Sequence, residues 1–204
     1  HGAILLSWRR EPDSAPAPIR RGENEAIRAM ASQSGDLWVF GYGSLMWRPG
    51  FAFVERHRAS LHGYHRSLCI FSHVHRGTPE APGLVLGLDR GGRCRGLAFR
   101  VEASEHEATL AYLREREQAT AVYLERHVRV RLDDGREVEA VTYVADRRHA
   151  QYAGRLPPEE LLRLVHQGIG ISGANPDYVR STHAQLIELG VSDPVLAGIA
   201  AKLS

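Results

Sequence analysis

Between residues 37 and 144, apolar residues either alternate with polar ones or form short runs. Both patterns are typical of β-strands, and residues that favour turns separate them. Two such turns, Arg90-Gly91-Gly92 and Asp133-Asp134-Gly135, lie between strand-like stretches, so we expect a hairpin at each. The predicted strands are residues 37–40, 63–72, 83–89, 93–101, 126–132 and 136–144.

Helical signals occur once between these strands and then fill the end of the chain. The last three predicted helices begin at prolines, which fit the first turn because an N–H there would have no intrahelical partner. Asn175 precedes one of these prolines and is predicted to cap its helix. The predicted helices are residues 104–118, 157–166, 176–189 and 194–200.

The order of these elements indicates the fold class. Because hairpins rather than helical crossovers connect the strands, the sheet should be mainly antiparallel. We expect an α+β fold, in which a small closed or nearly closed β-barrel has flanking helices and the helix at residues 104–118 covers one end or side. Residues 1–35 contain prolines and scattered charges and are predicted to be a partly ordered N-terminal appendage, whereas residues 36–204 are predicted to form the folded domain.

The composition excludes several classes of protein. Of 204 residues, 43% are hydrophobic and 25% charged, which suits a globular domain that buries a core without disulfides. A net charge of +2 gives no support for a nucleic-acid or membrane partner, and no apolar run is long enough to cross a bilayer. Cys69 and Cys94 lack CxxC spacing, so we expect buried free thiols in a reducing, cytoplasmic location.

The first candidate site is the turn formed by Tyr42, Gly43, Ser44 and Leu45, directly after a predicted strand. Several backbone N–H groups in such a turn can point at one spot, where they would bind an anion, a carboxylate or a developing oxyanion. The turn has neither the GxGxxG pattern nor the lysine of a nucleotide-binding loop. The alternative is an ordinary tight turn with Gly43 at positive φ.

The second candidate is an acidic residue on the helix at residues 104–118. At ~100° per residue, Glu117 lies ~20° from Leu110 and on the side of the apolar residues, whereas Glu115 lies ~140° away. A carboxylate on an apolar face has a raised pKa unless it is paired, and a raised pKa suits a general acid and base near neutral pH. The alternative is a buried ion pair with one of the many arginines.

A metal site is the third possibility, since several histidines occur close together in the sequence. They are His57, His62, His65, His73 and His75. No cysteine or acidic residue completes an obvious set of ligands, so scattered surface and loop histidines are the preferred interpretation. The chain also has no GxSxG motif, and neither cysteine has the local setting of a catalytic nucleophile.

Several segments resemble the ChaC family of γ-glutamylcyclotransferases. Residues 38–49 (WVFGYGSLMWRP) resemble its opening signature, and residues 112–117 (YLRERE) resemble its Tyr-Leu-x-x-Arg-Glu segment. Further matches are His75-Arg76-Gly77 followed by Pro82-Gly83, residues 140–144 leading to Tyr152, and Ser172-Gly173 with Asn175 and Tyr178. The resemblance spans about residues 36–190.

This resemblance implies a γ-glutamylcyclotransferase-like barrel that cleaves glutathione to 5-oxoproline and Cys-Gly without a metal or cofactor. It assigns catalysis to Glu117 and substrate binding to the turn from Tyr42 to Leu45, and it places Tyr123 and Tyr152 near the substrate. Other γ-glutamyl amino acids or amines as substrates, or a non-catalytic binding protein on the same fold, are the alternatives. The sequence does not indicate the oligomeric state.

One departure from the family pattern precedes Tyr123. The family usually has two glycines at the positions that Ala121 and Val122 occupy here. Their side chains narrow any close approach of the backbone, and β-branched Val122 disfavours positive φ. The shape of this loop and the role of Tyr123 therefore depend on how the two residues are accommodated.

Overall fold

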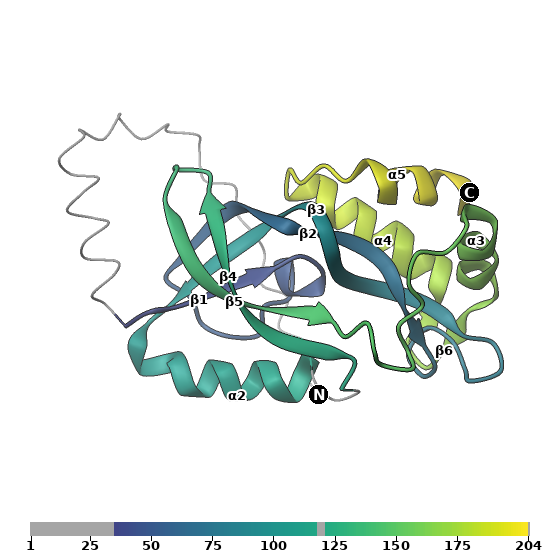
Figure 1. Ribbon diagram of the computed structural model, residues 1–204, viewed down its shortest axis with the longest axis horizontal. Helices are drawn as coiled ribbons and strands as arrows, with labels where there is room; N and C mark the ends of the chain where they lie inside the picture. Colours follow the sequence, from purple (N-terminus) through teal and green to yellow (C-terminus); the bar gives the residue numbers. More distant parts are fainter. Residues whose placement is uncertain (1–34, 118–120, 204) are drawn as a thin grey trace, which may run out of the picture. The chain divides into compact units, whose positions relative to one another are not determined.

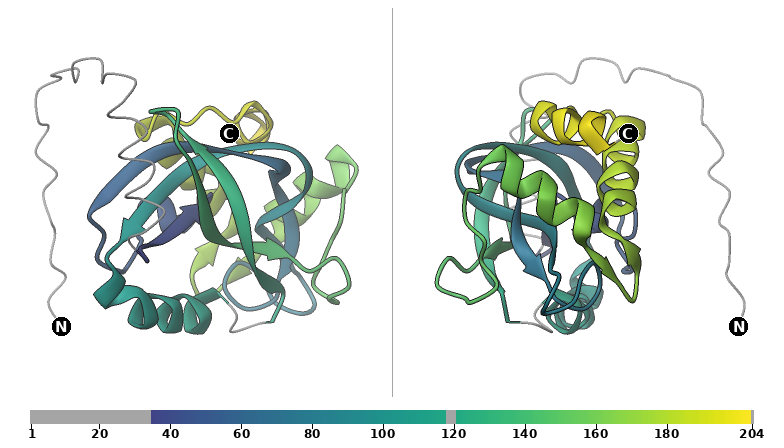
Figure 2. Two further views of the ribbon diagram at one scale, coloured as in Figure 1. Left: turned by 60° about the vertical axis from the view of Figure 1, so that its left-hand side comes forward. Right: turned by 90° about the vertical axis from the view of Figure 1, so that its right-hand side faces the viewer.

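The computed structural model describes residues 35–117 and 121–203 of the chain. Its barrel strands are β1 (Leu37–Gly41), β2 (Glu55–Ser72), β3 (Gly83–Val101), β4 (Tyr123–Leu132) and β5 (Glu137–Ala145). They close in the order β1-β3-β2-β4-β5, with antiparallel neighbours except for the parallel pair β1 and β5 (Figures 1 and 2). The predicted mainly antiparallel barrel is therefore confirmed. The predicted appendage lies outside the described residues, apart from residue 35.

Strands β2 and β3 form one long antiparallel ladder, and this corrects the first predicted hairpin. β3 runs without a break through Gly91 and Gly92, which have φ values of 100° and 69°. In β2 the opposite residue, Gly63, has a φ of 85° at a register shift. The glycines therefore bend a continuous ladder instead of reversing the chain, because β2 begins at Glu55 and offers hydrogen-bond partners on both sides of the bend.

The second predicted hairpin is confirmed, since β4 and β5 pair along their length around the turn at Gly135. Between β3 and β4 the chain forms a 3₁₀ turn, η2 (Ala103–Glu105), and the helix α2 (His106–Glu117). The predicted helix at residues 104–118 is thus confirmed up to residue 117, and residue 118 lies outside the described residues.

Helix α2 covers one side of the barrel (Figure 1). Its Leu110 and Leu113 are buried with Val39 of β1 and with Val141 and Tyr143 of β5. Replacing a fully buried leucine with alanine typically costs about 2–5 kcal/mol, so these two side chains are enough to fix the rotation of the helix. That rotation decides which residues at the end of α2 turn towards the barrel.

The elements that follow β5 lie on a different side of the barrel from α2 (Figures 1 and 2). They are α3 (Pro158–Gln167), the two-stranded hairpin of β6 (Ile169–Gly170) and β7 (Gly173–Ala174), α4 (Asn175–Glu188), α5 (Pro194–Ala200) and η3 (Ala201–Leu203). The three helices confirm the prediction. The hairpin was not predicted, because two residues per strand are too few to produce a recognisable alternation.

Asn175 does not cap α4 as predicted. The residue before it, Ala174, is the N-cap, and Asn175 is the fully buried first residue of the helix. Its side-chain amide accepts from the N–H of Leu84 at 2.7 Å and donates to the Leu84 carbonyl at 2.7 Å. The reason is that β1 pairs with β3 only at residues 97–101, so the other end of this β3 edge needs partners from elsewhere.

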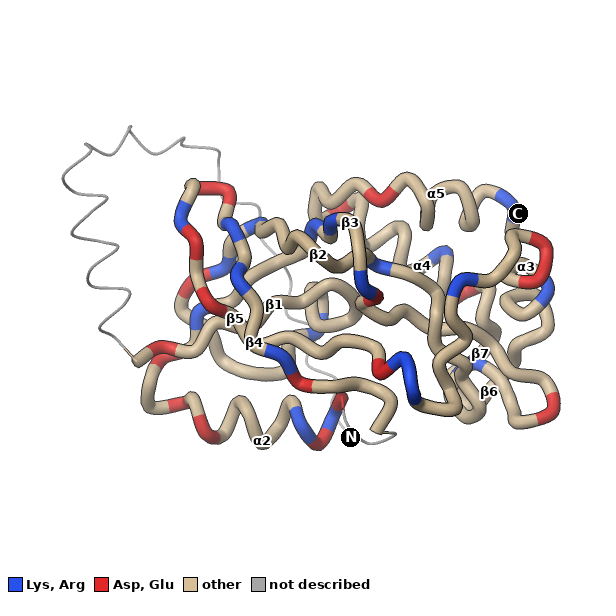
Figure 3. Tube along the Cα trace, viewed as in Figure 1, with Lys and Arg blue, Asp and Glu red and all other residues tan. Residues whose placement is uncertain are grey.

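Charge and polarity follow the composition. Acidic and basic residues are interspersed along the described chain instead of gathering on one face (Figure 3). Cys69 and Cys94 are buried and free, as expected. Within residues 35–117 and 121–203, no helix has the length and apolar character needed to span a membrane.

Candidate active site

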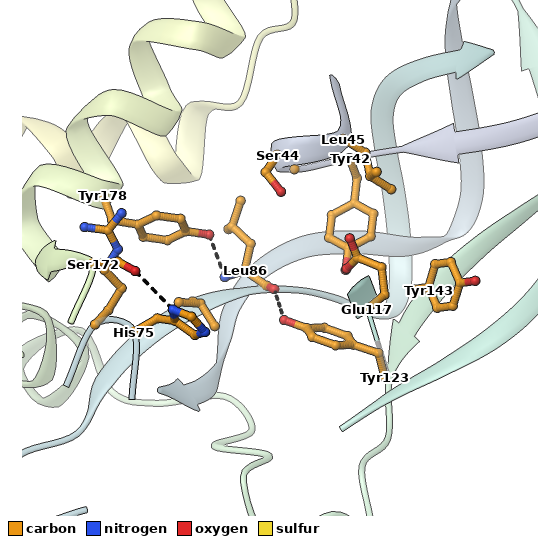
Figure 4. Close-up of a pocket in the computed structure, with 13 residues that line it drawn as sticks. Tyr42, Ser44, Leu45, His75, Leu86, Glu117, Tyr123, Tyr143, Ser172 and Tyr178 are labelled. Carbon is orange, nitrogen blue, oxygen red and sulfur yellow. Dashed lines mark hydrogen bonds between the residues drawn. The ribbon is translucent and has the colours of Figure 1, made fainter. Parts of the chain in front are cut away.

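A cavity of about 290 Å³ opens where the end of β1, the first half of β3, the end of α2 and the β6–β7 hairpin meet (Figure 4). It brings together six of the seven site residues predicted from the sequence, namely Tyr42, Gly43, Ser44, Leu45, Glu117 and Tyr123. The other lining residues are His75, Arg76, Val85, Leu86, Tyr143, Ser172 and Tyr178.

The turn after β1 lines this cavity and has backbone N–H groups without an acceptor among the described residues. Ser44 begins a short 3₁₀ helix, η1 (Ser44–Met46), and the Met46 N–H bonds to the Gly43 carbonyl at 2.9 Å. The first donors of such a helix have no intrahelical acceptor. Within the described residues, no acceptor bonds to the N–H groups of Gly43, Ser44 or Leu45. Gly43 has a φ of −131°, so the alternative of a tight turn at positive φ is wrong.

Glu117 is the last residue of α2 and turns towards the cavity, whereas Glu115 is exposed. The Glu117 side chain is only 18% exposed. This burial raises the pKa of its carboxyl group, and the neighbouring Arg116 guanidinium opposes part of the shift. Arg116 Nε lies 3.1 Å from Glu117 Oε1. The sequence left two interpretations of Glu117 open, a carboxylate with a raised pKa and a buried ion pair with an arginine. The structure shows features of both.

Two tyrosines bind the main chain of β3 at the cavity wall (Figure 4). The Tyr123 hydroxyl donates to the Leu86 carbonyl at 2.8 Å, and the Tyr178 hydroxyl accepts from the Leu86 N–H at 3.1 Å. Like Asn175, they occupy the β3 edge that β1 leaves open. Burial raises the pKa of Tyr123 and of Tyr42 well above the ordinary value, so both phenols stay neutral and protonated.

A cation lies among the lining residues of the β6–β7 side. Arg76 stacks over the Tyr178 ring, with 5.3 Å between the guanidinium carbon and the ring centre. Its Nη1 donates to the Ala174 carbonyl at 3.4 Å, and nearby the His75 Nδ1 and Ser172 Oγ are 3.0 Å apart. The cavity thus combines a carboxylate, a guanidinium and a set of backbone donors.

Comparison with known proteins places this chain in a family. A model of the family described as ChaC-like protein matches residues 37–203. The chain belongs to this family. An Escherichia coli relative named glutathione-specific gamma-glutamylcyclotransferase is 38% identical over 177 residues, 87% of this chain and 77% of the relative. A human relative named glutathione-specific gamma-glutamylcyclotransferase 1 is 33% identical over 147 residues, 70% of this chain and 66% of the relative.

A solved structure supports the fold of the ChaC-like chain. It is a γ-glutamyl cyclotransferase specific to glutathione from yeast, with a TM-score of 0.73 and 20% sequence identity. The match covers 83% of this chain and 96% of the yeast chain. At this low identity the likeness concerns the fold, and it confirms the expected γ-glutamylcyclotransferase-like architecture.

The departure of this ChaC-like chain before Tyr123 is accommodated by an unusual backbone. Ala121 adopts a positive φ of 55°, which costs a non-glycine residue roughly 1–2 kcal/mol. Val122 avoids positive φ and is instead buried, packing with Cys69, Ile70 and Ala145. Tyr123 therefore reaches the cavity despite the two substitutions, at the cost of strain at Ala121.

Tyr152 is the one predicted substrate-binding residue that does not line this cavity. Its hydroxyl donates to Asp89 Oδ2 at 2.9 Å, and Arg147 Nε bonds to the same carboxylate at 2.7 Å. It lines a different cavity, of about 790 Å³, between the barrel and helices α3 and α5. The structure thus corrects the predicted grouping, because Asp89 holds the ring away from Glu117.

Sequence reasoning from individual residues missed Arg116, Arg76 and Tyr178. Each lies inside a segment that resembles the family, so the motifs marked the right stretches of the ChaC-like chain. Their roles depend on contacts with residues 67 to 98 positions away, or on a stack between the segment after β2 and helix α4. A one-dimensional pattern does not encode such contacts.

Proposed function

We propose that this ChaC-like chain cyclises the γ-glutamyl group of reduced glutathione and releases 5-oxoproline and Cys-Gly. The observation that carries this proposal is the pairing, in one cavity, of the partly desolvated Glu117 carboxylate with the N–H groups of residues 43–45. The names of the bacterial and human relatives support the same activity.

The chemistry needs little from the protein because the nucleophile belongs to the substrate. The α-amine of a γ-glutamyl group reaches its own γ-carbonyl and forms a five-membered ring. Intramolecular positioning of this kind contributes up to ~7–11 kcal/mol in favourable systems. The enzyme must hold the chain in its folded conformation, remove a proton from the ammonium group and stabilise the charge that develops on the carbonyl oxygen.

Glu117 is the proposed proton carrier. Its carboxylate takes a proton from the α-ammonium group, the freed amine attacks the γ-carbonyl carbon, and the C–N bond to the cysteine residue breaks. Glu117 then returns its proton to the departing Cys-Gly amine. The ring nitrogen loses a second proton as the lactam forms, and the released amine takes up one proton to become an ammonium group, so that no proton is gained or lost overall. A carboxyl pKa raised by burial brings acid and base forms closer to balance near neutral pH.

The backbone donors and the cation would orient the substrate. The N–H groups of residues 43–45 hold the γ-glutamyl end, through its α-carboxylate or through the developing oxyanion. Arg76 carries the charge that complements the glycine carboxylate of the leaving dipeptide. Tyr42, Tyr123 and Tyr178 supply neutral walls that exclude water from the reacting atoms.

The test is mass spectrometry of products after incubating the purified protein with reduced glutathione, γ-Glu-Ala or a γ-glutamylamine. We expect 5-oxoproline and Cys-Gly in equal amounts from glutathione, and little product from the other two. Formation of 5-oxoproline only from the other compounds would keep the reaction and overturn the substrate. A folded protein that releases no 5-oxoproline from any of them would overturn the enzymatic function.

A cytoplasmic, reducing location is part of the proposal. Cys69 and Cys94 are both buried free thiols, and burial raises the pKa of the Cys69 and Cys94 thiols to about 12 and about 11. Such thiols are inert rather than redox-active. Reduced glutathione, the proposed substrate, is the form that a reducing compartment maintains.

A further inference from the structure

Arg66, in the middle of β2, is a buried cation that none of the steps above uses. Its side chain is only 3% exposed. Its guanidinium makes three short hydrogen bonds, from Nε to the Tyr42 carbonyl at 2.6 Å, from Nη1 to Asp193 Oδ2 at 2.7 Å and from Nη2 to the Arg95 carbonyl at 2.7 Å. Burying a charged group costs free energy, so three short hydrogen bonds to a buried guanidinium indicate that it fixes the position of its partners.

The contact with Tyr42 fixes the orientation of one peptide group. A trans peptide is planar, and its C=O and N–H point in opposite directions. Because the Tyr42 carbonyl points to Arg66, the N–H of the following Gly43 points away from Arg66. Gly43 lines the cavity that holds Glu117, and Arg66 does not. The Gly43 N–H is therefore directed to the cavity side.

A charged donor also strengthens the amide that it orients. Hydrogen bonds to an ionised group are shorter and roughly twice as strong as neutral ones. Donation to the Tyr42 carbonyl polarises the peptide and makes the Gly43 N–H a better donor. Within the described residues, no acceptor bonds to that N–H.

We propose that Arg66 is a positioning residue that aims and polarises the Gly43 N–H for the γ-glutamyl anion or oxyanion. This inference rests on the proposed function. Asp193 holds Arg66 in place, since its Oδ2 accepts from Arg66 and its Oδ1 accepts from the Leu196 N–H at the start of α5. Arg66 thus connects the turn at residues 42–45 to β3, through the Arg95 carbonyl, and to the start of α5, through Asp193.

The first test compares Arg66→Met and Arg66→Lys with a control, Arg100→Met. Arg100 also forms ion pairs, with Asp36 and Glu55, but lies outside the cavity. We expect kcat/KM for glutathione, corrected for the folded fraction, to fall about 10- to 100-fold in Arg66→Met and to be unchanged in the control. Arg66→Lys should pair with Asp193 and recover the melting temperature but not kcat/KM, because a compact ammonium group lacks the planar fork of donors that reaches Asp193 and the Tyr42 carbonyl together.

Chemical rescue separates positioning from a structural role. Arg66 lines two surface cavities, so small cations can enter the space that a truncated variant, Arg66→Ala, leaves. Methylguanidinium should restore part of kcat/KM, whereas ethylammonium should not, since only the planar ion reproduces the fork of donors. A folded Arg66→Lys protein with wild-type kcat/KM would overturn the proposal, even if Arg66→Met does not fold.

A readout without turnover distinguishes failure of this inference from failure of the proposed function. Binding of glutathione to Glu117→Gln protein labelled with ¹⁵N-glycine should shift the Gly43 amide resonance, and adding Arg66→Lys should remove most of that shift. No Gly43 shift, or an equal shift in both proteins, overturns the role of Arg66. Absence of 5-oxoproline from the wild-type protein in the product assay concerns the proposed function instead.

Discussion

The guanidinium of Arg116 donates a hydrogen bond of 2.9 Å to the hydroxyl of Ser44. The same guanidinium lies 3.1 Å from the Glu117 carboxylate and donates to the Arg48 carbonyl at 2.6 Å. One cation thus joins the end of α2 to the turn after β1. This link between residues far apart in the sequence fixes the position of Glu117, the proposed base, relative to the N–H groups of residues 43–45, which are proposed to bind the anion.

Arg116→Met should shift the pH dependence of the reaction. The guanidinium lowers the pKa of Glu117 and so opposes the effect of burial. Its removal should raise that pKa further and move the acidic limb of the kcat/KM profile to higher pH. Arg114→Met, which breaks a surface pair with Glu125, is the matched control and should leave the limb in place. An unmoved limb in Arg116→Met would contradict the proposed coupling.

Glu117→Gln should abolish most of the activity while leaving the fold intact. General acid–base catalysis contributes about 10²–10⁴-fold, and a glutamine amide cannot carry the proton, so we expect kcat to fall at least about 10³-fold. Glu115→Gln on the exposed face of the same helix should retain wild-type kcat. The measurement is 5-oxoproline release from glutathione, and normal turnover by Glu117→Gln would remove Glu117 from the mechanism.

The same substitution should stabilise the protein at neutral pH. The pKa of Glu117 is raised in the folded state, so its contribution to stability is fully present below the unfolded pKa and is lost as pH rises through the folded pKa. Glutamine does not ionise, so the Glu117→Gln protein does not lose stability in this way as pH rises. Thermal melts should therefore show Glu117→Gln above wild type at pH 8 and converging with it near pH 4. A constant difference across this range would contradict the raised pKa.

Ala121→Gly should relieve strain before Tyr123. The left-handed conformation at φ 55° is free for glycine, although glycine also loses more entropy on folding. We expect a net gain of about 0.5–1 kcal/mol and a rise in Tm of about 1–4 °C, measured by calorimetry. Ala111→Gly in the middle of α2 is the control, and it should lower stability by about 1 kcal/mol. Destabilisation by Ala121→Gly would mean that this loop carries no strain.

Asn175→Ala should destabilise the edge of β3. It would leave the N–H and carbonyl of Leu84 buried without partners, at about 1–3 kcal/mol for each group. We expect a loss of about 2–4 kcal/mol in the free energy of unfolding, measured by urea denaturation. Gln151→Ala, which removes one half-buried hydrogen bond to the Phe71 carbonyl, should cost under about 1.5 kcal/mol. Equal losses in the two variants would contradict the role given to Asn175.

Local periodicity was enough to predict most elements of this protein and one feature of its site. The alternation in β4 and β5, the proline starts of the C-terminal helices and the angle between Leu110 and Glu117 are properties of a few neighbouring residues. The inward turn of Glu117 followed from helical geometry alone, because a helix repeats every 3.6 residues wherever it packs. The resemblance of whole segments then indicated the family.

Tertiary structure decided everything that depends on partners distant in the chain. Gly91 and Gly92 bend a strand instead of ending it, because β2 supplies hydrogen bonds on both sides of the bend. Asn175 bonds to the open edge of β3 instead of capping α4 as predicted. Tyr152 bonds to Asp89 and therefore does not line the cavity that holds Glu117. The contacts of Arg66 and Arg116 have the same origin. Buried polar groups must find partners, and the folded chain alone determines which ones are near.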